Sequence, residues 1–249
     1  MLKAILFDLD DTLIDWSEMN EDWDSMQLRH LDGVFDYLCQ HHPLTDRNAY
    51  VHEFYQRTMD AWTSARTTLI APSLPDVLLE AAHAIGVPQG RITARACMEA
   101  YRWGVLPGAR LFPEVREVLG HFNKRGLKLG IITNAYQPMW ARDVELQHFA
   151  LSEFFPDCRF SAADHGYLKP HPSIFEAAMK RIGTKPEETV FVGDNLEADV
   201  AGAKQAGIHA VLRLLRRRPV ALDGIIQPDS TIHSLDELPA IFDRYFPGW

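Results

Sequence analysis

The sequence lacks several features that mark specialised classes of protein. Its three cysteines, Cys39, Cys97 and Cys158, are far apart and form no C-x-x-C pair, so we expect free thiols in a reducing compartment. No apolar run approaches the ~20 residues that a membrane helix needs. The chain also reaches Asp8 too early for a signal peptide. These absences predict a cytoplasmic protein with no membrane partner.

Positive charge is also scarce. The 249 residues carry 25 lysines and arginines against 34 aspartates and glutamates, which gives a formal net charge of -9. Because phosphate backbones select basic surfaces, this balance disfavours nucleic acid as a partner. The hydrophobic share of 47% is that of an ordinary globular protein, long enough for one large domain or two moderate ones.

The chain divides into two parts by its hydrophobic pattern. Between about residue 19 and residue 104, apolar residues recur at helical spacing and no strand pattern interrupts them. The predicted helices cover residues 19–42, 45–62, 74–87 and 92–104. Thr45 or Asp46 suits the N-cap of the second helix, and Gly86 and Gly104 suit left-handed C-caps of the last two. This block is predicted to be a helical bundle.

Outside this block, short apolar strands alternate with helices. The predicted strands are 3–8, 127–133, 158–162, 189–193 and 208–215, and the predicted helices are 113–124, 139–149, 173–182, 198–206 and 235–245. Such alternation predicts an α/β fold, a parallel sheet with helices on both faces. The first strand must join this sheet from across the helical block. We therefore predict an α/β core (residues 1–15 and 106–249) interrupted by a helical insertion (residues 16–105).

Polar side chains gather where the predicted strands end. The stretch AILFDLDDTLID (4–15) places Asp8 and Asp10 at the end of the first strand. The other strand ends contribute Thr133 with Asn134, then Lys169, then Asp194. Open α/β sheets build their sites at this edge. Any one of these residues alone is more often a turn residue or, for Lys169, a solvated surface lysine.

Together these groups favour phosphoryl-transfer chemistry. Carboxylates that lie close together resist joint ionisation unless a cation compensates them. No cluster of histidine and cysteine favours zinc, so Mg²⁺ is the expected ion. A hydroxyl group, amides and one ammonium could then hold a phosphoryl group and stabilise its developing charge.

Four segments resemble the motifs of the haloacid dehalogenase-like hydrolases. They are FDLDDTL (7–13), ITN (132–134), GYLKPHPSIF (166–175) and GDNLEADVAGAKQAG (193–207). They occur in the family's order and spacing. The resemblance implies a Rossmann-like core, and it implies that residues 16–105 are a helical cap domain.

The resemblance also assigns roles to the motif residues. Asp8 would be the nucleophile that becomes an aspartyl phosphate, and Asp10 the general acid and then the general base. Thr133 and Asn134 would bind the phosphoryl group, and Lys169 would steady Asp8. Three residues would hold Mg²⁺, with Asp199 as a supporting acid. These three are Asp8, Asp10 through its main-chain carbonyl, and Asp194.

Two features choose between branches of this family. An acid at Asp10 favours a phosphoester, because an alkoxide leaving group needs a proton and a halide does not. Residues 16–105 contain no lysine, which argues against the phosphonate-cleaving relatives with their cap lysine. We therefore expect a Mg²⁺-dependent phosphomonoester hydrolase. The alternatives are a sugar-phosphate mutase on the same scaffold and a regulatory or binding protein that has lost turnover.

The substrate is expected to be a small soluble phosphorylated metabolite, and the protein a monomer or homodimer. Side chains of the insertion that could face the site are mostly aromatic or basic, although aromatics on helices more often belong to a core. They are Trp16, Trp23, His52, Tyr55, Arg57, Trp62, Arg66, Arg102 and Trp103. The run RRR at 216–218 could line the rim of the site, but a solvated charge run is the alternative.

Overall fold

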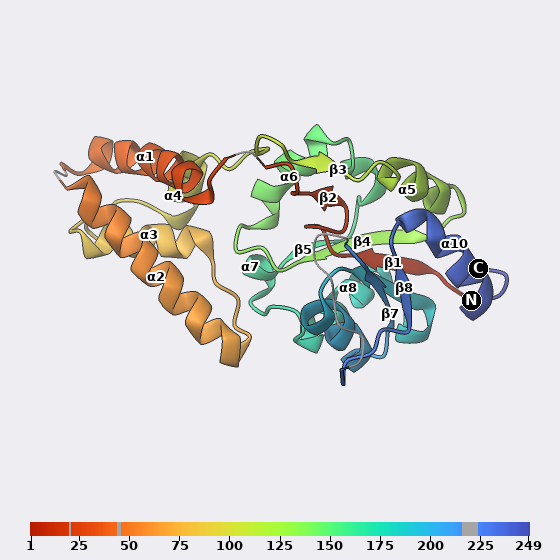
Figure 1. Cartoon of the computed structure of the whole chain (residues 1–249). Coiled ribbons are helices and arrows are strands. Elements are labelled where there is room, and N and C mark those ends of the chain that lie inside the picture. Colours follow the sequence, from red (N-terminus) through yellow and green to blue (C-terminus); the bar gives the residue numbers. More distant parts are fainter. Residues whose placement is uncertain (20, 44–45, 216–223) are drawn as a thin grey trace.

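The computed structural model describes residues 1–19, 21–43, 46–215 and 224–249. A helical unit lies beside a sheet unit, and both chain termini lie at the end of the sheet unit that faces away from the helical one (Figure 1). Thr45 and the run at 216–218 lie outside the described residues.

Six parallel strands form the centre of the sheet unit, in the order β5-β4-β1-β6-β7-β8. They are β1 (Ala4–Phe7), β4 (Lys128–Thr133), β5 (Arg159–Ser161), β6 (Thr189–Gly193), β7 (His209–Arg213) and β8 (Ser230–Ile232). The first five confirm the predicted strands, and the parallel sheet confirms the predicted α/β class. The sequence analysis missed β8, whose three residues Ser-Thr-Ile are too few to show alternation.

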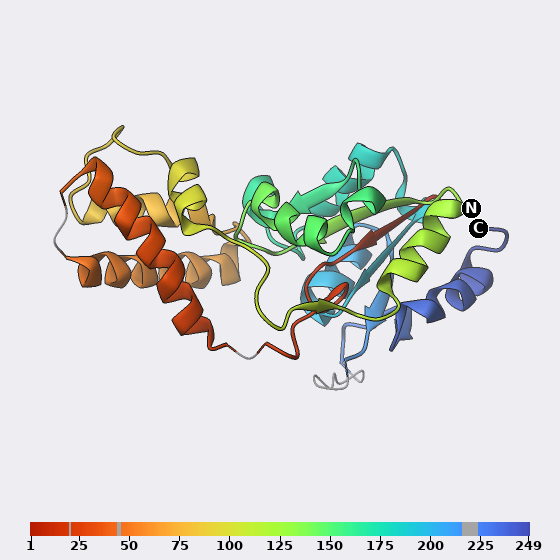
Figure 2. The ribbon, with the colours of Figure 1, turned by 90° about the horizontal axis from the view of Figure 1, so that it is seen from above.

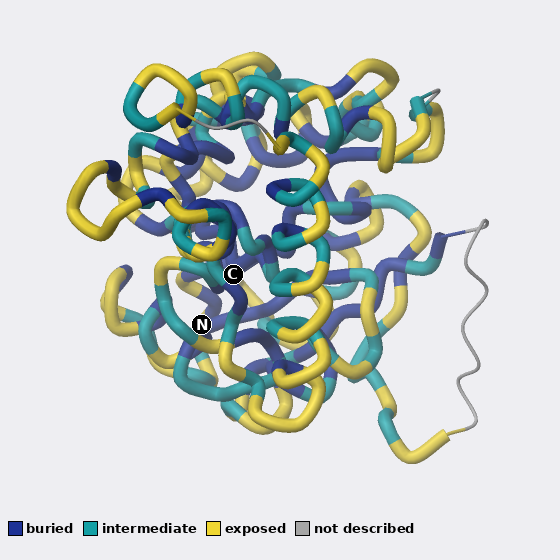
Figure 3. Tube along the Cα trace, turned by 90° about the vertical axis from the view of Figure 1, so that its left-hand side faces the viewer, coloured by how far each residue is buried: buried dark blue, intermediate teal, exposed yellow. Residues whose placement is uncertain are grey.

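Helices cover both faces of the sheet because alternate strand residues point to opposite sides. In β1, Ile5 and Phe7 pack with α5 (Val115–Lys124), α6 (Met139–His148) and α10 (Leu238–Tyr245). Ala4 and Leu6 pack with the opposite group. This group consists of α8 (Pro172–Ile182), the π-helical turn η3 (Leu196–Ala201) and α9 (Gly202–Gln205). The sheet therefore lies in the buried interior, with exposed turns outside it (Figure 3).

Short elements complete the sheet unit. They are α7 (Ala162–His165) and the 3-10 turns η1 (Ser152–Phe154), η2 (Pro186–Glu188) and η4 (Leu235–Glu237). The helix predicted at 198–206 is in fact η3 followed by α9. Isolated π turns of this kind often occur at functional sites.

The helical unit contains α1 (Trp23–His41), α2 (Arg47–Thr68), α3 (Leu74–Ala84) and α4 (Ala94–Tyr101), around a hydrophobic core of its own. The Asp22 and Asp46 side chains cap α1 and α2 by accepting hydrogen bonds from Ser25 and Ala49 main-chain N–H groups. The predicted left-handed cap at Gly104 is wrong, because Arg102 takes that conformation at φ 53°. Within the described ranges, no helix combines the length and hydropathy that a membrane span requires.

Two chain segments connect the units (Figure 2). Where these segments leave the sheet unit, they pair with each other in a short two-stranded ribbon. There, β2 (Ile14–Asp15) pairs antiparallel with β3 (Arg110–Leu111), so the outgoing and returning chain lie together. The Arg110 guanidinium donates to the buried Asp15 carboxylate at 3.2 Å. This ribbon lies close to the boundaries proposed for the insertion, residues 15/16 and 105/106.

Candidate active site

Asp8 and Lys169 meet in a buried ion pair at the carboxyl end of β1. The Lys169 Nζ atom lies 2.7 Å from one Asp8 carboxylate oxygen, and Thr12 donates a 3.4 Å hydrogen bond to the other. Burial and neighbouring carboxylates raise the pKa of Asp8 well above its usual value, although Lys169 opposes this shift. Asp8 therefore needs further positive charge to act as a carboxylate.

Three carboxylates converge at this point. Oxygen atoms of Asp8, Asp194 and Asp199 all lie within 4.8 Å of one another. Lys169 contributes one positive charge to this group, at 2.7 Å from Asp199 as well as from Asp8. The three carboxylates carry three formal negative charges on hard oxygen donors, and Lys169 offsets only one of them. The negative charge that remains fits a Mg²⁺ ion. The predicted metal residue Asp194 is thus brought to Asp8.

Asp199 is held in place by the loop that carries Asp194. One of its oxygens accepts a 3.0 Å hydrogen bond from the Asn195 main-chain N–H, and the other faces Lys169. Gly193 permits this approach, because a Cβ atom there would lie 2.3 Å from the Asp199 carboxylate. One Asp199 oxygen thus contacts the Asn195 main chain and the other lies beside Lys169, and its supporting role stays a prediction.

Thr133 ends β4, Asn134 follows it, and the two contact two other predicted site residues. The Thr133 hydroxyl donates to Asp10 at 3.1 Å. The Asn134 side chain accepts from the Lys169 main-chain N–H at 2.7 Å and donates to the Lys169 carbonyl at 2.9 Å. Asn134 thereby fixes the segment that presents Lys169. Its predicted contact with a phosphoryl group stays a prediction.

Asp10 has a partner that the sequence analysis missed. Arg142, which is buried on α6, donates to both Asp10 oxygens at 2.7 and 3.1 Å. The Trp16 indole N–H donates to the same carboxylate at 3.0 Å. Burial alone would raise the pKa of Asp10, but Arg142, with Thr133 and Trp16, outweighs burial and holds this pKa below its usual value. These three donors therefore favour the carboxylate form of Asp10.

Arg142 in turn depends on a second buried acid. Its Nε atom pairs with Glu145, which lies one helical turn further along α6 and is 0% exposed. Burial raises the pKa of the Glu145 carboxyl group, and Arg142 opposes that shift. The only sequence signal for this arrangement was an Arg and a Glu three residues apart beside apolar positions, a pattern that surface helices also show.

The comparisons with known proteins agree with this geometry. Residues 2–207 match the haloacid dehalogenase-like hydrolase family. The chain belongs to this family. Glyceraldehyde 3-phosphate phosphatase from Methanopyrus kandleri is 30% identical over 85% of this chain and 83% of its own length. The predicted hydrolase of the phosphatase branch is thereby confirmed.

Solved structures of this hydrolase family have the same overall fold. A 2-haloacid dehalogenase from Pseudomonas syringae pv. Tomato superimposes with a TM-score of 0.68 at 26% identity, covering 98% of this chain and 100% of its own. A HAD phosphatase from Thermococcus onnurineus gives a TM-score of 0.61 at 25% identity, covering 97% and 98% of the two chains. These neighbours confirm the predicted Rossmann-like core.

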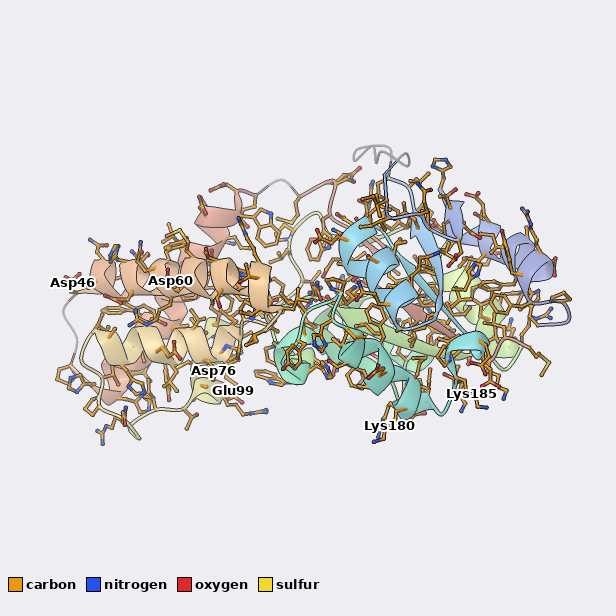
Figure 4. The ribbon with its side chains drawn as sticks, turned by 90° about the horizontal axis from the view of Figure 1, so that it is seen from below. Asp46, Asp60, Asp76, Glu99, Lys180 and Lys185 are labelled. Atoms are coloured by element: carbon orange, nitrogen blue, oxygen red, sulfur yellow. The ribbon has the colours of Figure 1, made fainter. Side chains whose placement is uncertain are left out.

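The hydrolase site opens into a cavity between the two units. Among the described residues, four of the aromatic candidates from the insertion line it, namely Trp16, Trp23, Trp62 and Trp103. The other five candidates do not line it within the part of the chain that the structure describes, and Arg66 instead lines a neighbouring pocket. Charged residues of both units, such as Asp60, Asp76 and Lys180, lie on the outer surface (Figure 4).

The Arg142 ion pairs give a prediction about stability. Arg142→Met should lower the free energy of unfolding by about 3–5 kcal/mol, because Glu145 would keep a buried charge without a partner. The double variant Arg142→Met/Glu145→Leu should recover the part of that loss that comes from Glu145, while Asp10 keeps Thr133 and Trp16 but still lacks Arg142. Urea unfolding measures both values. A single variant as stable as the parent chain would contradict the buried pair.

Proposed function

We propose that the protein is a Mg²⁺-dependent phosphomonoester hydrolase that acts on a small soluble phosphorylated metabolite through an aspartyl phosphate on Asp8. The observation that carries this proposal is the arrangement at the carboxyl end of β1. There the Asp8 carboxylate pairs with Lys169 and lies beside Asp194, and Asp10 is two residues further along the chain. We also propose that residues 16–105 form a cap domain that selects the substrate.

In the first step an Asp8 oxygen attacks phosphorus, and the bond from phosphorus to the ester oxygen breaks. Lys169 is placed to orient Asp8 and to offset the charge that develops on the phosphoryl oxygens, the usual source of catalysis in phosphoryl transfer. Asp10 would donate a proton to the departing alkoxide.

In the second step Asp10 would accept a proton from water. The oxygen of that water attacks phosphorus, and the bond from phosphorus to Asp8 breaks, which releases phosphate and restores the carboxylate. Arg142, Thr133 and Trp16 hold Asp10 as the carboxylate that a general base requires. These three donors also fix its orientation.

Asp8 and Asp194 would hold the Mg²⁺ ion, together with the main-chain carbonyl of Asp10. A bound Mg²⁺ would supply positive charge that neutralises the phosphoryl oxygens and keeps the carboxylates together. Lys169, paired with Asp199, would supply the second positive charge beside Asp8.

Metal dependence is the first test of this function. Hydrolysis should require Mg²⁺ and stop in EDTA. Asp194→Asn should weaken Mg²⁺ activation about 10-fold or more while the protein stays folded, because the change is nearly isosteric and removes one anionic ligand. Asp76→Asn, on the exposed surface of α3, is the matched control and should change nothing. Full turnover in metal-free buffer would refute the proposal.

The double role of Asp10 gives a second test. Asp10→Asn should slow phosphorylation of Asp8 by alkyl phosphates about 10²–10⁴-fold, the usual contribution of general acid–base catalysis. p-Nitrophenyl phosphate has a stable leaving group and should still react. Since dephosphorylation of Asp8 lacks its base, rapid mixing should show a burst of about one p-nitrophenolate per site. Asp8→Asn should show no burst. If the rates with both esters fell equally and no burst appeared, Asp10 would have only a structural role.

A further inference from the structure

The cavity into which the site opens is larger than a phosphoryl group alone would fill. Its volume is about 550 Å³, within the range of about 300–1,000 Å³ that is typical of pockets for drug-sized ligands. Asp8, Asp10 and Lys169 line one part of it. The part beyond them is lined mainly by aromatic and apolar side chains, which are Trp16, Met19, Trp23, Trp62, Trp103 and Tyr136.

Four of these aromatic side chains form two pairs, and both pairs line the same cavity. The Trp16 and Trp23 rings have centroids 6.3 Å apart, and the Trp62 ring lies 6.1 Å from Tyr136. Trp23 is 53% exposed, so much of its ring surface is open to a ligand. Gln27 of α1 donates to the Tyr136 hydroxyl at 3.2 Å and so links the helical unit to this wall.

The cavity offers little to a second anionic group on a substrate. Within the described ranges, the cationic side chains that line it are Lys169 and Arg142. Lys169 already pairs with Asp8 and Asp199. Arg142 pairs with Asp10 and Glu145. A carboxylate or second phosphate on the substrate would therefore lie against indole rings, which present negative faces.

We infer that the alcohol half of the substrate carries a planar, uncharged ring that lies against Trp62 and Trp23. This inference rests on the proposed phosphatase function and narrows its substrate class. Ring-on-ring contacts are favourable in offset and tilted arrangements, and they also remove apolar surface from water.

Matched pairs of esters test the ring directly. 2-Phenylethyl phosphate and n-propyl phosphate both release primary alcohols, as do uridine 5′-monophosphate and ribose 5-phosphate, so the members of each pair differ mainly in the ring. In at least one pair, kcat/KM should favour the ring ester by about 10-fold or more, the range measured for base–aromatic stacking. Trp62→Ala should bring that ratio close to one, because the ring ester should lose far more of its kcat/KM than the ringless ester.

Two variants guard against a general effect of substitution. Trp62→Phe keeps an aromatic ring and should keep most of the preference. Met59→Ala changes an exposed residue of the same helix outside the cavity lining and should keep all of it.

The outcomes separate this inference from the proposed function. Acetyl phosphate, which is activated and has no ring, reports on phosphatase activity alone, and failure to hydrolyse it or any ester would refute the function itself. If acetyl phosphate is hydrolysed but neither ring ester has a higher kcat/KM than its ringless partner, the inference of a ring on the substrate is refuted. A ring preference that survives Trp62→Ala, or faster hydrolysis of phosphoserine or phosphocholine than of both ring esters, would also overturn the inference.

Discussion

Charge compensation among buried carboxylates is the constraint on which the rest of this site depends. Asp8 and Asp199 share the single ammonium of Lys169, while Asp10 and Glu145 share the guanidinium of Arg142. Asp8, Asp199 and Glu145 are buried, and an unpaired charge at their depth would cost several kcal/mol, whereas the Asp10 carboxylate is partly exposed. In the proposed mechanism the two cations therefore separate Asp8, the proposed nucleophile, and its proposed metal ligands from Asp10, the proposed general base. This division lets neighbouring acids perform different tasks.

The sheet imposes this arrangement, and the sequence contains most of the information for the sheet. A parallel strand that is covered on both faces needs a continuous apolar run, which is why β1 and β6 were predictable. The strand β8 and the ribbon of β2 with β3 have three residues or fewer per strand, too few to show a period. Their pairing depends on neighbours that are distant in the chain.

The site residues that could be predicted from the sequence are those at the carboxyl ends of the strands. Asp8, Thr133 and Asp194 lie at the carboxyl ends of strands that are side by side, so their proximity follows from topology. Arg142 reaches Asp10 from a helix 132 residues further along the chain, and no local pattern specifies that contact. The engagement of Asn134 with the Lys169 main chain likewise depends on how two loops meet. Tertiary packing decides such partners, and the aromatic lining of the cavity arises in the same way.

The central claim is that the phosphoryl group passes through Asp8 in two successive displacements. Each in-line displacement inverts the configuration at phosphorus, so two of them restore it. The most direct measurement is therefore the stereochemical course of transfer, with a substrate whose phosphoryl group is chiral by oxygen isotopes and an alcohol as the acceptor in place of water. The account predicts net retention of configuration. Net inversion would show direct attack on the substrate and would contradict a phosphorylated Asp8.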